Sequence, residues 1–163
     1  MTGMNRQTTS ETLRRMEQAR MLDSEIAGRN KLYFLNKNSS QARILVENAE
    51  NSRKLAISRK REISVLIDYL EGPPVALLFG SYAKGMERKT SDIDLMLIGG
   101  RKKKFDKFED ETGLEVQVFG MGEKQFISRI AKKDHLIIEA VRNHVCLRNT
   151  DRFVTLMWRA VYG

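Results

Sequence analysis

Short apolar segments separated by amphipathic ones dominate the second half of the chain. The apolar segments at 75–79, 92–98 and 114–119 are bounded by glycine, proline or polar residues, as is typical of strands. A last short apolar segment lies at 145–147. The segments between and after them have the apolar spacing of helices. This order predicts an α/β (α+β) domain over residues 72–163, with helices at 81–87, 102–111, 123–132, 135–143 and 152–162.

Residues 39–71 form the longest helical pattern in the chain. Ser39 or Ser40 can cap its start, and the Gly-Pro-Pro sequence at 72–74 ends it. Apolar side chains recur with a roughly helical period, so we expect one connecting helix with a break near residues 51–52. The same amphipathic pattern would suit pairing with a second copy, so a homodimer is one partner that we consider.

The first 38 residues have a different pattern. A polar helix is expected at 9–19, followed by short strands at 21–26 and 31–36 around a turn that contains Gly28. Two short strands around a glycine turn predict a β-hairpin. This element carries basic side chains on its helix and around its turn, among them Arg14, Arg15, Arg29 and Lys31.

Composition narrows the class of protein. Hydrophobic residues make up 41% of the chain and charged residues 31%, which is typical of a soluble globular protein. No apolar segment approaches the length of a membrane span, and the N-terminus has no apolar signal-peptide core. Cys146 is the only cysteine, so no internal disulfide is possible and we expect a cytoplasmic protein. The net charge of +8 favours a polyanionic partner or substrate.

The central apolar segments carry the residues with the clearest chemistry. Gly80 and Ser81 follow the first segment, and Asp92 and Asp94 lie two residues apart at the start of the next. Side chains at positions i and i+2 of a strand share a face. Paired carboxylates repel unless a cation or proton lies between them, and their hard oxygens suit Mg²⁺. A glycine lets the backbone approach a ligand, and the serine hydroxyl with the first amides of the next helix can hold a phosphate. The pattern predicts metal-assisted phosphoryl or nucleotidyl transfer.

A rival phosphate-binding motif is excluded. Gly80 and Gly85 have the spacing of a P-loop, but Met86 and Glu87 stand where that motif requires Lys and Ser or Thr.

The sequence from Gly80 to Leu95 resembles the minimal nucleotidyltransferase domains of the DNA polymerase β superfamily, and the resemblance extends over roughly residues 72–150. It implies a small fold with a mixed sheet, a nucleoside triphosphate substrate with ATP as the expected donor, and a hydroxyl acceptor on a protein, small molecule or RNA end. It also implies two Mg²⁺ ions held by Asp92 and Asp94. Many small relatives are antitoxins that nucleotidylate a HEPN-type toxin. The residues that the resemblance assigns to nucleotide binding are Gly80, Ser81, Lys84, Gly85 and Ser91.

Family members use a third acid on a neighbouring strand, which here is the segment at 114–119. Its apolar residues share one face, which leaves Glu115 and Gln117 on the other. We favour Glu115, which could bind metal or accept the proton of the attacking hydroxyl. If the position belongs to Gln117, the acid is replaced by a neutral amide and transfer should be slow or absent.

Residues 2–36 resemble the recognition helix and wing of a winged helix-turn-helix domain, without the two helices that normally precede them. The resemblance implies contacts with duplex DNA, and the alternative is an element used for packing or dimerisation. In the DNA-binding case the protein is a transcriptional regulator that keeps the nucleotidyltransferase fold as a nucleotide sensor or scaffold. The DNA contacts would come from Arg14, Arg15, Arg29 and Lys31.

Overall fold

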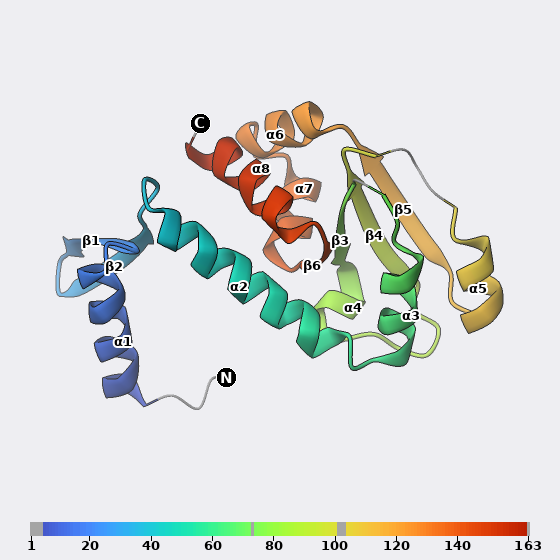
Figure 1. The fold of residues 1–163 in the computed structure, drawn as a ribbon, viewed down its shortest axis with the longest axis horizontal. Helices are drawn as coiled ribbons and strands as arrows, with labels where there is room; N and C mark the ends of the chain where they lie inside the picture. The colour runs from blue at the N-terminus through green and yellow to red at the C-terminus, as the bar shows by residue number, and fades with distance from the viewer. Residues whose placement is uncertain (1–4, 73, 101–103, 163) are drawn as a thin grey trace. The chain divides into compact units, whose positions relative to one another are not determined.

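The computed structural model describes residues 5–72, 74–100 and 104–162. The chain divides into two compact units, Met1–Val46 and Glu47–Gly163. Figure 1 shows the order of helices and strands along the chain.

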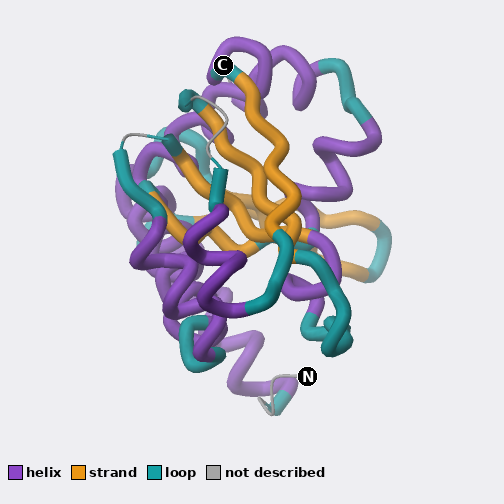
Figure 2. Tube along the Cα trace, turned by 90° about the vertical axis from the view of Figure 1, so that its right-hand side faces the viewer, coloured by secondary structure: helices purple, strands orange, loops and turns teal. Residues whose placement is uncertain are grey.

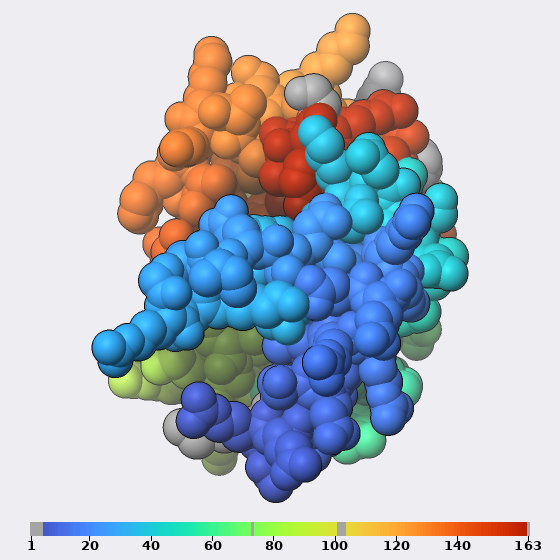
Figure 3. Space-filling model, turned by 90° about the vertical axis from the view of Figure 1, so that its left-hand side faces the viewer, coloured from blue at the N-terminus to red at the C-terminus, as the bar shows by residue number. Residues whose placement is uncertain are grey.

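The first unit consists of a helix, a hairpin and the start of a second helix. Its elements are α1 (Arg6–Gln18), β1 (Leu22–Ala27), β2 (Asn30–Leu35) and the first turns of α2 (Ser40–Ile57). The two strands pair antiparallel around a turn at Gly28, whose φ of 62° suits glycine. Figure 3 shows the surface of this unit, with α1 in the darkest blue and the hairpin in a lighter blue. The predicted helix and hairpin are confirmed, although the helix begins three residues earlier than expected.

The second unit is built on a four-stranded mixed sheet. The strands are β3 (Val75–Phe79), β4 (Ile93–Ile98), β5 (Val116–Met121) and β6 (Val145–Arg148), in the order β5-β4-β3-β6. Strand β3 pairs antiparallel with both β4 and β6, whereas β4 and β5 pair parallel. Figure 2 shows these strands in orange. The predicted α/β fold with a mixed sheet is confirmed.

Helices cover both faces of this sheet (Figure 1). Residues of α3 (Arg61–Tyr69) and α5 (Asp106–Thr112) join the apolar core on one face, and residues of α6 (Glu123–Ala131), α7 (His135–Arg142) and α8 (Thr150–Tyr162) join the core on the other. Because side chains alternate along each strand, odd and even positions of β4 belong to different cores. Among the described residues, no helix is both long enough and apolar enough to cross a bilayer.

The long helix expected over residues 39–71 is two helices. Helix α2 ends at Ile57 and α3 begins at Arg61, so the expected break near residues 51–52 was wrong. Asn51 instead fixes α2 to the rest of the unit, since its Oδ1 accepts a hydrogen bond of 3.0 Å from the Thr150 hydroxyl. The Asn51 side chain that suggested a break therefore makes a tertiary contact from within a continuous helix.

Two other helix boundaries differ from expectation. Helix α4 (Gly80–Lys84) is a single turn, because Gly85 takes a left-handed conformation with φ of 66° and ends it. Helix α5 begins at Asp106, and residues 102–103 of the expected helix lie outside the described residues.

A buried ion pair joins α2 to the segment before β6. Nε2 of His144 lies 3.2 Å from Oε2 of Glu50, and Nδ1 of the same ring lies 2.5 Å from the Val141 carbonyl oxygen. Since a carbonyl only accepts, Nδ1 donates in this contact, and Nε2 faces the Glu50 carboxylate. Burial alone would raise the pKa of Glu50, but the contact with His144 and the charges of His144 and Arg53 outweigh it and lower that pKa. Glu50 therefore stabilises the fold above the pKa of the unfolded carboxyl, and this contribution is lost as the pH falls through the lowered value.

Replacement of Glu50 should destabilise the second unit. We expect Glu50→Ala to lower the free energy of unfolding by about 3 kcal/mol, because it leaves the buried His144 side chain without its partner. Urea unfolding of the full chain at neutral pH measures this. Asn48→Ala, at an exposed position of the same helix, should change it by less than about 0.5 kcal/mol. Equal losses in the two variants would show that the ion pair does not stabilise the fold.

Candidate functional site

The glycine-serine turn and the carboxylate pair meet at one end of the sheet. The antiparallel register of β3 and β4 places Phe79 opposite Asp94, and Gly80 follows with φ of 69°. A Cβ built on Gly80 would lie 2.9 Å from Cγ of Asp94 and closer still to its Oδ2. Such a distance is not tolerated, so only a glycine lets the backbone lie this close to the carboxylate. The turn and the carboxylate therefore form one site.

The two carboxylates of this site disfavour each other's charge. Asp92 directly precedes β4 and Asp94 is the second residue of that strand, and both are half-buried. Burial raises the pKa of Asp94, and the nearby charge of Asp92 raises it further. A divalent cation between the two carboxylates would relieve this repulsion.

Gln117 occupies the position beside the carboxylate pair. In the parallel register of β4 and β5, Asp94 pairs with Gln117, and Nε2 of Gln117 donates a 2.7 Å hydrogen bond to Oδ2 of Asp92. Glu115 is exposed and precedes β5, where its backbone carbonyl accepts a hydrogen bond from the Ile93 amide. No group of three His, Cys, Asp or Glu side chains in the described part of the chain could hold a metal ion. The structure therefore does not bring Glu115 to the pair as expected, because the strand register selects the residue two positions later.

The donor set suits one divalent cation. Asp92 and Asp94 supply hard oxygens, and the Gly80 backbone lies directly against the Asp94 carboxylate. A third carboxylate for a second ion is missing from the described residues. The amide nitrogen of Gln117 is turned toward Asp92, as expected of a donor and not of a metal ligand. The expectation of two Mg²⁺ ions stays a prediction, with Asp92 and Asp94 as the carboxylate ligands that the described residues offer.

The other residues expected to bind nucleotide have structural contacts. Nζ of Lys84 lies 3.3 Å from Oε1 of Glu139 on α7. Gly85 ends α4. The Ser91 hydroxyl accepts a hydrogen bond of 2.9 Å from the Arg88 amide and closes the turn before β4. Of the expected nucleotide-binding residues, Gly80 lies against a carboxylate of the pair, and Ser81 follows it directly in the chain.

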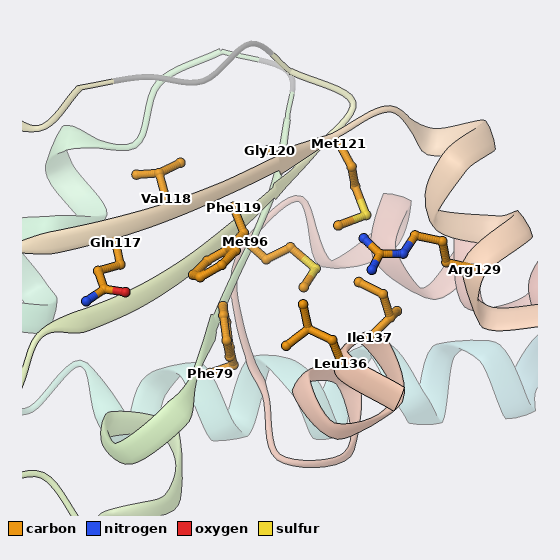
Figure 4. A pocket seen from close by; sticks show the side chains of 10 residues that line it. All are labelled: Phe79, Met96, Gln117, Val118, Phe119, Gly120, Met121, Arg129, Leu136 and Ile137. Carbon is orange, nitrogen blue, oxygen red and sulfur yellow. The ribbon is translucent and has the colours of Figure 1, made fainter. Parts of the chain in front are cut away.

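A pocket of about 400 Å³ adjoins this site (Figure 4). It lies over the end of the sheet that carries Gln117, and α7 forms its opposite wall. The sequence pattern did not reveal it, although the alternation that places Gln117 beside Asp94 also places Phe119 on the same face. The pocket is lined by Phe79, Met96, Gln117, Val118, Phe119, Gly120, Met121, Arg129, Leu136 and Ile137.

The basic residues expected to contact DNA lie in the first unit. Arg14 and Arg15 are exposed on α1, and Arg29 is exposed in the hairpin turn. Lys31 instead bonds within its unit, with Nζ 2.6 Å from Oε2 of Glu17 and 5.1 Å from the centre of the Tyr33 ring.

The mixed sheet, with a glycine-serine turn against two carboxylates, has the small nucleotidyltransferase fold. The family model described as "Polymerase beta, Nucleotidyltransferase" matches residues 61–153, which is more than half of the chain. The chain belongs to this family of nucleotidyltransferases.

Comparison with solved structures and curated proteins adds little to this assignment. The chain is similar to one in a structure described as "Crystal structure of the toxin-antitoxin with AMP-PNP", with 16% sequence identity and a TM-score of 0.37. The match covers 69% of this chain and 86% of the other. No curated protein matches the sequence.

Proposed function

We propose that this protein is a Mg²⁺-dependent nucleotidyltransferase that moves a nucleoside monophosphate from a nucleoside triphosphate, with ATP as the expected donor, to a hydroxyl group. The observation that carries the proposal is the close approach of the Gly80 backbone to the Asp94 carboxylate. It supports a single site that binds both the phosphate groups and the metal ion. The family assignment supports the reaction class.

Each residue of the site has a role in this proposal. The triphosphate lies against Gly80 and Ser81, and Asp92 and Asp94 hold Mg²⁺. The bound ion supplies neutralisation of phosphate charge and orientation of the triphosphate. The acceptor oxygen forms a bond to the α-phosphorus while the bond to the bridging oxygen breaks, and pyrophosphate leaves. The hydroxyl proton passes to water, because the neutral amide of Gln117 cannot accept it.

For the acceptor we propose a protein hydroxyl. The ground for this is the resemblance of the Gly80–Leu95 motif to minimal nucleotidyltransferase domains, since many small proteins with such domains are antitoxins that modify a partner toxin.

Replacing one carboxylate should show whether the pair binds the nucleotide or only stabilises the fold. We expect Asp94→Asn to weaken binding of Mg²⁺ with ATP by at least about tenfold, since it removes a direct metal ligand. Isothermal titration calorimetry measures the affinity. Label transfer from α-labelled ATP to lysate proteins should disappear in the same variant.

The matched control is Asp110→Asn, an exposed aspartate on α5. It should bind and transfer as the unmodified protein does. If Asp94→Asn and Asp110→Asn behave alike, the carboxylate pair does not bind the nucleotide and the proposal fails.

A second candidate function is favoured by Gln117. With an amide in place of the third acid, the site can bind a nucleoside triphosphate but transfers its nucleoside monophosphate slowly, as a nucleotide sensor would. In that case the exposed Arg14, Arg15 and Arg29 suit duplex DNA, and the protein is a DNA-binding regulator. Label transfer to any protein favours the enzyme. Nucleotide binding without transfer, together with salt-sensitive binding of duplex DNA, favours the regulator.

A further inference from the structure

We infer that the pocket over β4 and β5 binds the nucleoside half of the triphosphate, with the base against the ring of Phe119. The inference rests on the proposed function, because it extends the phosphate and metal site to the sugar and base of the same ligand.

The pocket begins where the carboxylate site ends. Two of its lining residues, Phe79 and Gln117, are the register partners of Asp94 on the two strands that flank it. Phe79 also directly precedes Gly80. A ligand whose α-phosphate lies at Asp94 therefore has its next group at the mouth of this pocket.

The middle of the pocket is apolar and partly aromatic. The rings of Phe79 and Phe119 meet edge to face with their centres 5.5 Å apart. Phe119 remains 37% exposed and Leu136, on the opposite wall, 48% exposed. Exposed apolar side chains that face each other across a cavity favour a flat, weakly hydrated group between them. A nucleobase is such a group, and it stacks on aromatic rings without regard to its identity.

Polar groups lie at the two ends of this apolar middle, as Figure 4 shows for Gln117 and Arg129. The Gln117 amide donates through Nε2 to Asp92, and its Oε1 is an acceptor suited to a ribose hydroxyl. Nε and Nη2 of Arg129 donate to Oδ2 of Asp134 over 3.1 and 3.0 Å, which fixes the guanidinium on the wall. A guanidinium carries five N–H donors, so more remain than these two bonds use, and they suit the acceptor atoms on the edge of a base.

The order of these groups matches a nucleoside better than the acceptor. Starting from Asp94, a ligand meets an acceptor for the sugar, then an apolar slot, then fixed donors. Arg129 is the only charged side chain among the described residues that line the pocket, and no base that could activate an acceptor hydroxyl lies among them. The hydroxyl acceptor is therefore expected to approach the α-phosphate from outside the pocket.

The test compares two ligands that differ by the nucleoside. Binding of AMP-PNP and of inorganic triphosphate, each with Mg²⁺, is measured by calorimetry for the full chain and for Phe119→Ala, Leu136→Ala and Asp94→Asn. We expect Phe119→Ala to raise the dissociation constant for AMP-PNP about tenfold and to leave that for triphosphate unchanged. Leu136→Ala, which lies on a helix and not on the edge strand, should act in the same direction. Phe34→Ala is the control, because it removes an equally exposed ring in the hairpin of the first unit.

The outcomes separate the inference from the proposed function. Unchanged AMP-PNP affinity in Phe119→Ala and Leu136→Ala, with a loss in Asp94→Asn, overturns the pocket assignment and leaves the proposed function standing. Equal weakening of both ligands in Phe119→Ala also overturns it, because the ring would then act through the carboxylates. Failure of the unmodified protein to bind either ligand overturns both.

Discussion

Gln117→Asp is expected to raise the rate of nucleotidyl transfer by about 100-fold, the lower end of what a positioned general base contributes. The register of β4 and β5 places this side chain beside Asp94, where the neutral amide adds no negative charge and cannot accept a proton. An aspartate there would supply both a third metal ligand and a base for the acceptor hydroxyl. The initial rate of label transfer from α-labelled ATP to lysate proteins, at saturating Mg²⁺, measures the effect.

Two further variants make this result specific. Gln117→Asn has the length of aspartate without its charge and should not raise the rate. Glu115→Gln tests the alternative assignment, and we expect it to leave transfer unchanged because Glu115 lies before β5. Loss of transfer in Glu115→Gln, with no gain in Gln117→Asp, would show that Glu115 and not Gln117 stands in the place of the third acid.

Gly80→Ala is expected to lower transfer by about 100-fold or more, the cost of displacing a catalytic group by about 1 Å. The added Cβ would overlap the Asp94 carboxylate, which must then move away from the proposed phosphate-binding position. Affinity for Mg²⁺ with AMP-PNP should fall together with the rate, since both depend on Asp94. Calorimetry and the label-transfer assay give the two values.

Gly113→Ala separates this clash from backbone strain. Gly113 has φ of 70°, nearly the 69° of Gly80, but a Cβ built on it meets no atom within 4 Å. Both substitutions strain the left-handed backbone to a similar degree, so the strain alone should lower the stability of the two variants by similar amounts. Only Gly80→Ala should lose nucleotide binding, and a similar loss in Gly113→Ala would mean that strain, not the carboxylate, is responsible.

The central part of this fold could be predicted because local and tertiary signals agree there. The apolar segments that became β3 and β4 are buried throughout, so their length and composition indicated strands directly. The spacing of Asp92 and Asp94 placed both carboxylates on one face, and Gly80 predicted a turn where the backbone can approach a ligand. These inferences use only residues that are close together in the sequence. That Gly80 lies against Asp94 was not predicted and is seen only in the structure.

The residue that takes the place of the third acid could not be identified from the sequence alone. Alternation along the strand reduced the choice to Glu115 and Gln117, which share a face. The choice between them depends on how β5 is aligned with β4, and hydrogen bonds between distant segments determine that alignment. The pocket was missed for the same reason, since its walls come from five separate segments.

The break in the long helix was predicted at the wrong place, because a tertiary hydrogen bond outweighs a local preference at residues 51–52. Asn51 and Ser52 have weak helix propensity, which suggested an interruption of the long helix. In the structure each forms a hydrogen bond that a regular helix permits, Asn51 with Thr150 and Ser52 with the Asn48 carbonyl.

The start of β5 has a consequence for how the site could change. The Val116 amide donates to Oε1 of Glu109 on α5, and the Ile93 amide donates to the Glu115 carbonyl. These bonds fix the position of the first residues of β5. The pairing of every later residue of β5 with β4 follows from that position. A slip of two residues would exchange the amide beside Asp94 for a carboxylate that the chain already carries. The chemical character of the site is thus chosen by strand alignment, and a mutation at Glu109 that loosened it could alter reactivity without touching any residue that meets the substrate.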